Sequence, residues 1–134
     1  MVLVGLCYSD YYLCVGHTVF NIVVLKMSLM ADGPGMGEGY EATKPWHPLY
    51  NILIFLIAAY MYLSILPIVT LHEAIVTSIV CGTLTIIVDV VGWVIIKHSW
   101  SLTFKEFYID YQPWITLIYL AIYISPFLAY LAIR

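Results

Sequence analysis

The feature that most constrains this chain is the apolar run Ala74–Lys97, AIVTSIVCGTLTIIVDVVGWVIIK, whose interior carries a single charge, Asp89. A helix of this length extends about 36 Å, which is enough to cross the hydrocarbon core of a bilayer. The composition agrees, since 63% of the residues are hydrophobic and 10% are charged, whereas soluble domains carry about 25% charged residues. We therefore predict an integral membrane protein whose main surroundings are a lipid bilayer.

Two further apolar runs have the length of a membrane span. Residues 49–69 and 113–133 each extend about 31 Å as helices. Pro48 and Pro113 mark their starts, where a missing backbone N–H costs little. The predicted fold is all-α, an integral membrane helical bundle with three transmembrane helices at about 49–69, 74–97 and 113–133.

The N-terminal segment leaves alternatives open. Residues 1–26 are apolar overall but carry polar groups, among them Asp10 and His17. They lack the order of a signal peptide, which places cations first, then an unbroken apolar core, then small residues at a cleavage site. The remaining alternatives are a fourth transmembrane helix near 1–25, an interfacial helix, or residues upstream of a true start at Met27 or Met30.

The polar connections set the domain organisation and the sidedness. Residues 31–45 are rich in Gly and Pro, which break helices and strands. Residues 98–112 are too polar to span and carry many aromatic side chains, which favours an interfacial helix. The link Thr70–Glu73 is so short that it predicts an antiparallel pair of spans. Both longer connections and most cations fall on one side, predicted to be cytoplasmic. The predicted units are an N-terminal apolar segment 1–30, a linker 31–45, and a transmembrane domain 46–134 with the interfacial loop 98–112.

One face of the central run gathers small and polar residues at spacings of four and three. They are Ser78, Gly82, Thr85, Asp89 and Gly92. In lipid, small residues let helix backbones approach each other, and polar groups turn toward other helices. We therefore expect this stripe to face protein, and the opposite face to meet lipid. The opposite face carries Ile75, Ile79, Ile86, Val90 and Val94.

Asp89 needs a partner inside the membrane, because a charged side chain at a helix centre costs about 2.5–3.5 kcal/mol on insertion scales. At the same depth the third span carries Tyr119 and Tyr123, and the first carries Tyr60 one turn away, near Leu56. Their phenols can donate hydrogen bonds to the carboxyl group. We expect a neutral Asp89 that bonds to Tyr or Thr and joins helices. A proton, ion or substrate site and a salt bridge to another subunit stay open. The third span's own polar stripe comprises Thr116, Tyr119, Tyr123, Pro126 and Tyr130.

A second, weaker cluster lies at the predicted cytoplasmic surface and comprises His47, His98, Glu106 and Asp110. Imidazoles and carboxylates can bind a metal or run acid–base chemistry. Their spacing contains no tight metal-binding pair, and the chain has no nucleophile elbow, phosphate loop or dinucleotide fingerprint. We assign no catalytic residue, cofactor or metal. The five scattered cations and the net charge of −3 also argue against binding nucleic acid.

These features favour a non-catalytic subunit or assembly factor of a larger membrane protein complex. One partner helix cannot fill the polar stripes of both the second and the third span, so we expect other transmembrane subunits, either copies of this chain or different proteins. The Ser78–Gly92 stripe is then the packing seam. The alternatives are a small homo-oligomeric transporter or channel that uses Asp89, and a lipid-acting membrane enzyme that uses the surface cluster.

Overall fold

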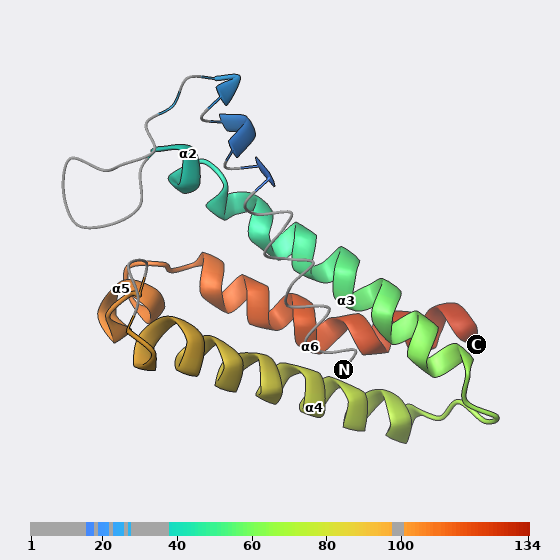
Figure 1. Ribbon diagram of the computed structural model, residues 1–134. Coiled ribbons are helices and arrows are strands. Elements are labelled where there is room, and N and C mark those ends of the chain that lie inside the picture. Colours follow the sequence, from blue (N-terminus) through green and yellow to red (C-terminus); the bar gives the residue numbers. More distant parts are fainter. Residues whose placement is uncertain (1–15, 18, 22, 26, 28–37, 98–100) are drawn as a thin grey trace.

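The computed structural model describes residues 16–17, 19–21, 23–25, 27, 38–97 and 101–134, and Figure 1 shows how its helices are arranged. Within the described residues every regular element is a helix. The elements are α2 (Glu38–Glu41), the 3₁₀ helix η1 (Lys44–Trp46), α3 (His47–Ser64), α4 (Leu71–Asp89), the π-helix η2 (Val90–Ile95), α5 (Phe104–Tyr108) and α6 (Trp114–Ile133). In this described part, three continuous helical stretches are long and apolar enough to cross a membrane, Glu38–Ser64, Leu71–Ile95 and Trp114–Ile133. The predicted all-α class with three such helices is confirmed.

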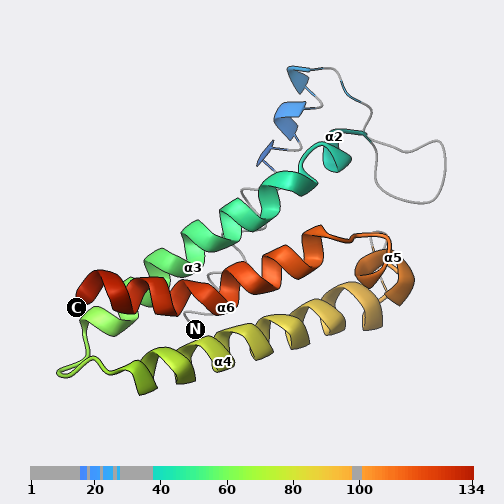
Figure 2. The ribbon, with the colours of Figure 1, turned by 180° about the vertical axis from the view of Figure 1, so that it is seen from behind.

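Helix α6 lies between α3 and α4 and packs along both, whereas α3 and α4 barely touch each other. Figures 1 and 2 show this order from opposite sides. The predicted direct pairing of the first two spans is therefore replaced by packing of each against the third. Small residues on α6 explain this, because Ala129 packs against Ala59 of α3, and the Ser125 hydroxyl lies 3.3 Å from the Ile52 carbonyl oxygen. Such residues let two helix backbones come close together.

The ends of the helices follow local chemistry. Helix α3 ends at Ser64 rather than at the predicted Val69, because Pro67 lacks an N–H and disfavours a helical residue before it. Helix α4 begins at Leu71, earlier than the predicted Ala74. Thr70 is its N-cap, and its side chain accepts a hydrogen bond from the Glu73 N–H at 3.3 Å. The connection between the two helices is therefore the segment 65–70.

The buried side chains form two clusters along α6. The larger one lies toward α5 and contains Phe55, Phe107, Tyr111, Ile115, Ile118 and Ile122. The smaller one lies toward the other end of the bundle and contains Ala59, Leu63 and Ala129. Because Phe107 belongs to α5, the segment predicted to lie at the membrane interface is anchored to the bundle by its own aromatic side chain.

The described part of the N-terminal segment attaches to α2 and to the turn between α2 and η1. Residues 16–17, 19–21 and 23 are helical. The buried Asn21 amide donates to the Gly39 carbonyl oxygen at 3.0 Å and to the Thr43 hydroxyl at 3.2 Å. Most of the predicted fourth span near 1–25, and the first part of the linker 31–45, lie outside the described residues. The end of that linker is helical in spite of Gly39, and the Gly39 carbonyl also accepts from the Thr43 hydroxyl at 2.8 Å.

Candidate functional site

The stripe of small residues on α4 is buried against α6. Ala74, Ser78, Gly82 and Thr85 are its buried members. The seam is tightest at Gly82, where a Cβ atom would lie 2.3 Å from the ring of Tyr123. The Tyr123 ring therefore occupies the space that any other residue at position 82 would need. The structure thus brings together Ser78, Gly82 and Tyr123 of the predicted packing site.

Ser78 also binds the backbone of α6 next to its proline. The Ser78 hydroxyl donates to the Tyr123 carbonyl oxygen at 2.6 Å. Pro126 lies inside α6 and lacks the N–H that would donate to the Ile122 carbonyl, one residue before Tyr123. The Tyr123 carbonyl is therefore next to the position where the proline interrupts the hydrogen bonds of the helix. The seam therefore combines close packing with one hydrogen bond between helices.

Asp89 lies at the end of the seam and belongs to a chain of hydrogen bonds. The Tyr119 hydroxyl donates to Asp89 Oδ2 at 3.2 Å. The Tyr119 and Tyr108 hydroxyl oxygens are 3.1 Å apart, close enough for a hydrogen bond. Three oxygen atoms from α4, α6 and α5 are thus connected in sequence. Of the expected phenol partners, Tyr119 lies beside Asp89, Tyr123 lies against Gly82, and Tyr60 is exposed.

The stripe changes character beyond Asp89, because the chain widens into the π-helix η2. A π-turn rotates each residue less than an α-turn, so the spacing that places Gly92 on the stripe no longer applies. A Cβ atom at Gly92 would meet nothing within 4 Å. Val94, expected to face lipid, is half-buried against the larger cluster. The Trp93 carbonyl oxygen accepts from the Leu102 N–H at 2.8 Å, which joins η2 to the segment before α5.

Thr85, the remaining residue of the predicted stripe, is buried but serves its own helix. Its hydroxyl donates to the Cys81 carbonyl oxygen at 2.9 Å, one turn earlier. Ser and Thr hydroxyls within a helix can donate a hydrogen bond to the carbonyl oxygen one turn earlier in this way. Thr85 therefore contributes a small packing surface to the seam.

His47 lies in an aromatic junction at the start of α3. It is buried, and its Nδ1 atom forms a hydrogen bond with the Tyr111 hydroxyl. The Tyr40 ring contacts both of these rings. The Lys44 ammonium lies 4.9 Å from the centre of the Tyr111 ring and 2.6 Å from a Glu41 carboxylate oxygen. This junction joins α2 and α3 to the connection between α5 and α6.

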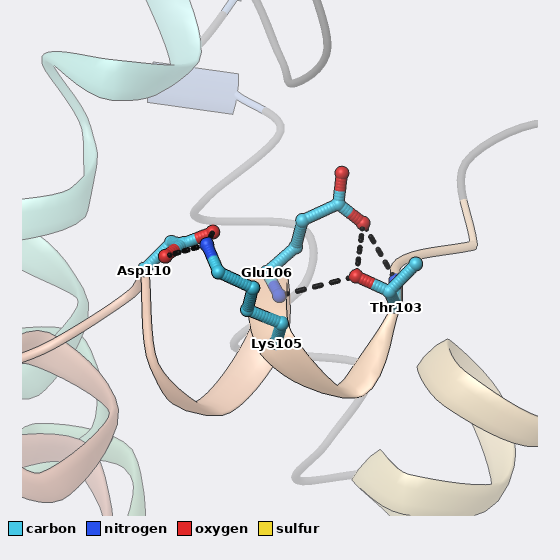
Figure 3. Close-up of polar contacts among 4 residues, drawn as sticks. All are labelled: Thr103, Lys105, Glu106 and Asp110. Carbon is cyan, nitrogen blue, oxygen red and sulfur yellow. Dashed lines mark hydrogen bonds and ion pairs between the residues drawn. The ribbon is translucent and has the colours of Figure 1, made fainter.

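The two carboxylates of the predicted surface cluster are used within α5 and its flanks (Figure 3). Glu106 Oε2 accepts from the Thr103 backbone N–H and from its hydroxyl, both at 2.7 Å. The Glu106 N–H in turn donates to the Thr103 hydroxyl oxygen, which completes a capping box. Asp110 pairs with Lys105 at 2.7 Å.

The predicted surface cluster is not assembled as a metal site by the described residues. His98 lies outside the part of the chain that the structure describes. Within that part, no group of three or more His, Cys, Asp or Glu side chains could hold a metal ion. His47 bonds to Tyr111, Glu106 to Thr103, and Asp110 to Lys105. Sequence reasoning missed these partners, and only the spacing of Thr103 and Glu106 signalled one of them, as a capping box.

The capping box predicts a measurable acid titration. Hydrogen bonds from the Thr103 N–H and hydroxyl lower the pKa of Glu106 below its ordinary value of 4.5. Because the folded-state pKa is lowered, the cap stabilises α5 fully above pH 4.5 and is lost as the pH falls through the lowered pKa. We expect NMR titration of the Glu106 carboxyl carbon in micelles to give a midpoint below 4.5. Thr103→Ala should raise that midpoint toward 4.5, and an unchanged midpoint in this variant would contradict the assignment.

The fold and the candidate site together define a class: a helical chain with three helices able to cross a membrane, joined by a small-residue seam and a phenol–carboxyl chain. Comparison with protein-family models, with curated proteins and with solved structures finds no match to this chain. The case for a function therefore rests on the residues described above.

Proposed function

We propose that this chain is an integral membrane protein with three spans, and that it acts as a non-catalytic subunit or assembly factor of a membrane protein complex. The observation that carries the proposal is that polar groups bind inside the bundle, whereas apolar side chains face outward. Hydroxyl and amide groups in the three helices bind the chain's own backbone, as Ser78, Thr85 and Asn51 do. The outward faces carry large apolar side chains, which suit lipid and other transmembrane helices.

The proposed surface for a partner is the outer face of α6, defined by its exposed large apolar residues. They are Leu117, Leu120, Ile124, Leu128 and Leu131. They recur at spacings of three and four, so they line one side of the helix. Because α6 is the middle helix, a partner helix seated there would lie over the centre of the layer that α3, α6 and α4 form in Figures 1 and 2.

The structure changes the reason for expecting a partner subunit. From the sequence, a partner is expected because two polar stripes exceed what a single helix can fill. In the structure the two stripes meet each other, since Ser78 and Gly82 of α4 contact Tyr123 of α6. The Ser78–Gly82 part of the stripe is thus an internal seam rather than a surface for another subunit. The proposal now depends on the outer face of α6.

The proposed sidedness places the start of α3, the end of α4 and α5 on the cytoplasmic side. Figure 1 shows α2 and α5 at the same end of the bundle. Three lysines belong to the segments at or next to that end: Lys44 in η1, Lys97 after η2 and Lys105 in α5. Arg134 follows α6 at the opposite end. Short loops rich in Lys and Arg usually remain in the cytoplasm.

The test is the native mass of the protein after extraction from its own membrane in mild detergent. We expect a mass far above one chain of 15.2 kDa, with other polypeptides present. Ile124→Trp, on the outer face of α6, should reduce the amount of this complex. Ile79→Trp is the matched control, because Ile79 is exposed on α4, away from that face.

The outcomes of that experiment distinguish the complex from the other candidate functions. A single chain in its detergent belt, or equal effects of the two Trp variants, would contradict the complex. A small homo-oligomer without other polypeptides would instead favour transport.

A transporter or channel is the second candidate, and the chain Asp89–Tyr119–Tyr108 is the observation that favours it. A hydrophobic carbodiimide modifies a protonated carboxyl group within the membrane. Transport predicts that Asp89 is modified and that the transported cation protects it; modification without protection would count against transport. A lipid-acting enzyme has less support, because His47, Glu106 and Asp110 are bound into local structure.

A further inference from the structure

The Asp89–Tyr119–Tyr108 chain connects the interior of the helical layer with its α5 end. Asp89 is half-buried at the end of α4, and Tyr119 is half-buried on α6. Tyr108 belongs to α5, beside the exposed Ile109 and the exposed ion pair of Lys105 and Asp110. Each oxygen in the chain lies within 3.2 Å of the next, so hydrogen bonds can run without a break from Tyr108 to Asp89.

We propose that Asp89 is a reversible proton-binding site that exchanges protons with water at the α5 surface through Tyr119 and Tyr108. This inference rests on the proposal that α4 and α6 span a membrane, and it does not depend on the complex. The ligand is a proton rather than a metal ion. Within the described residues, no group of three His, Cys, Asp or Glu side chains gathers to hold a metal, and calcium takes six to eight oxygen ligands.

The proton transfer is balanced at every atom. Tyr119 passes its hydroxyl proton to the Asp89 carboxylate, Tyr108 passes its own to Tyr119, and Tyr108 receives a new proton from a hydronium ion. One carboxylate becomes a carboxylic acid and one hydronium becomes water. Neither phenol is left charged, so no further acid or base is required. The observed donation from Tyr119 to Asp89 Oδ2 has the direction that this transfer needs.

The end of α4 supplies a second, independent feature. The π-helix η2 begins directly after Asp89. Single π-turns within α-helices are rare, and they occur frequently at functional sites. A π-turn also shifts the side chains that follow it out of the regular register of the α-helix. The Trp93 carbonyl, in the last turn of η2, accepts from the Leu102 N–H, which secures the segment that leads into α5. Asp89 and Tyr108 are thus held on segments that contact each other.

The test measures hydrogen–deuterium exchange at the carboxyl group of Asp89 by infrared spectroscopy of the full chain in lipid vesicles. The carbonyl band of a protonated Asp89 is assigned by its loss in Asp89→Asn, and it shifts when D₂O replaces water. We expect Tyr108→Phe and Tyr119→Phe to slow the shift by about tenfold or more, because each removes one link of the chain. Tyr130→Phe is the matched control, a half-buried phenol of α6 that packs in the smaller cluster.

Every outcome decides the proposal. The replacement of Tyr by Phe keeps the ring, and helix content measured by circular dichroism verifies that each variant is folded. Slow exchange in Tyr108→Phe and Tyr119→Phe, with normal exchange in Tyr130→Phe, supports the route. The absence of an Asp89 band at any pH, a band that never exchanges, or equal rates in all variants would overturn it. A native mass of one chain would leave the route intact and contradict only the complex.

Discussion

Replacing Gly82 with Leu is expected to destabilise the packing of α4 on α6 by about 1–3 kcal/mol, the usual cost of overfilling a packed interior. The first side-chain carbon alone would lie 2.3 Å from the Tyr123 ring. The ring is the far end of a side chain and can move outward, but it then loses its contact with α4. The free energy of unfolding in mixed micelles, followed by tryptophan fluorescence, measures the loss.

Gly92→Leu is the matched control for this prediction. Gly92 lies on the same continuous helical stretch, and a Cβ atom there meets nothing within 4 Å. Both variants replace a glycine in a helix with leucine, and both should gain about 1 kcal/mol of helix propensity. A second check is Tyr123→Ala in the Gly82→Leu background, which should recover part of the lost stability by opening space. Equal destabilisation by the two Leu variants would show that the seam does not depend on close packing at Gly82.

The sequence predicts this seam because its signal is local. Residues spaced by four and three fall on one face of a helix, and small groups in an apolar run stand out against their neighbours. Ser78 and Gly82 are read from the sequence in this way, and the structure places both against α6. The same reasoning, applied to depth along each span, places Tyr119 near Asp89, where the structure has a hydrogen bond.

The central place of α6 is not predictable from the same signals. Its face toward α3 depends on Ser125 and Ala129, and an alanine is inconspicuous in an apolar run. The predicted polar stripe of α6 includes Thr116, which is exposed. The π-helix after Asp89 was also missed, because a regular period of 3.6 residues assumes that the helix does not change its winding. Local spacing therefore predicts faces, whereas the choice of neighbour depends on the shapes of all three helices.

The junction around His47 was missed for a different reason. Its hydrogen-bond partner, Tyr111, is 64 residues away in the sequence. The sequence suggests a surface cluster of His and carboxylate groups because those types share chemistry, but a buried imidazole can equally bind a phenol. No pattern in one sequence identifies which of many tyrosines this is. The structure identifies it because α3 and the α5–α6 connection meet at the same end of the bundle.

Tyr111→Phe is the second variant with a large expected effect. It removes the hydroxyl oxygen that bonds to His47 Nδ1 and that also lies 3.4 Å from the Tyr40 hydroxyl. Removing one partner of a buried hydrogen bond costs about 1–3 kcal/mol, because the other group has lost water without full compensation. We expect the free energy of unfolding to fall by this amount in the same micelle assay. Tyr60→Phe, which alters an exposed phenol of α3, should leave it unchanged.

A double variant separates the hydrogen bond from the packing of the rings. Replacing both partners of a buried hydrogen bond with apolar groups of similar shape is often nearly neutral. His47→Phe combined with Tyr111→Phe should therefore be more stable than Tyr111→Phe alone. If instead the two losses add, the rings stabilise the junction independently, and the bond between them contributes little. In that case the ring contacts of His47 with Tyr40 and Tyr111 would contribute more to the junction than the hydrogen bond does.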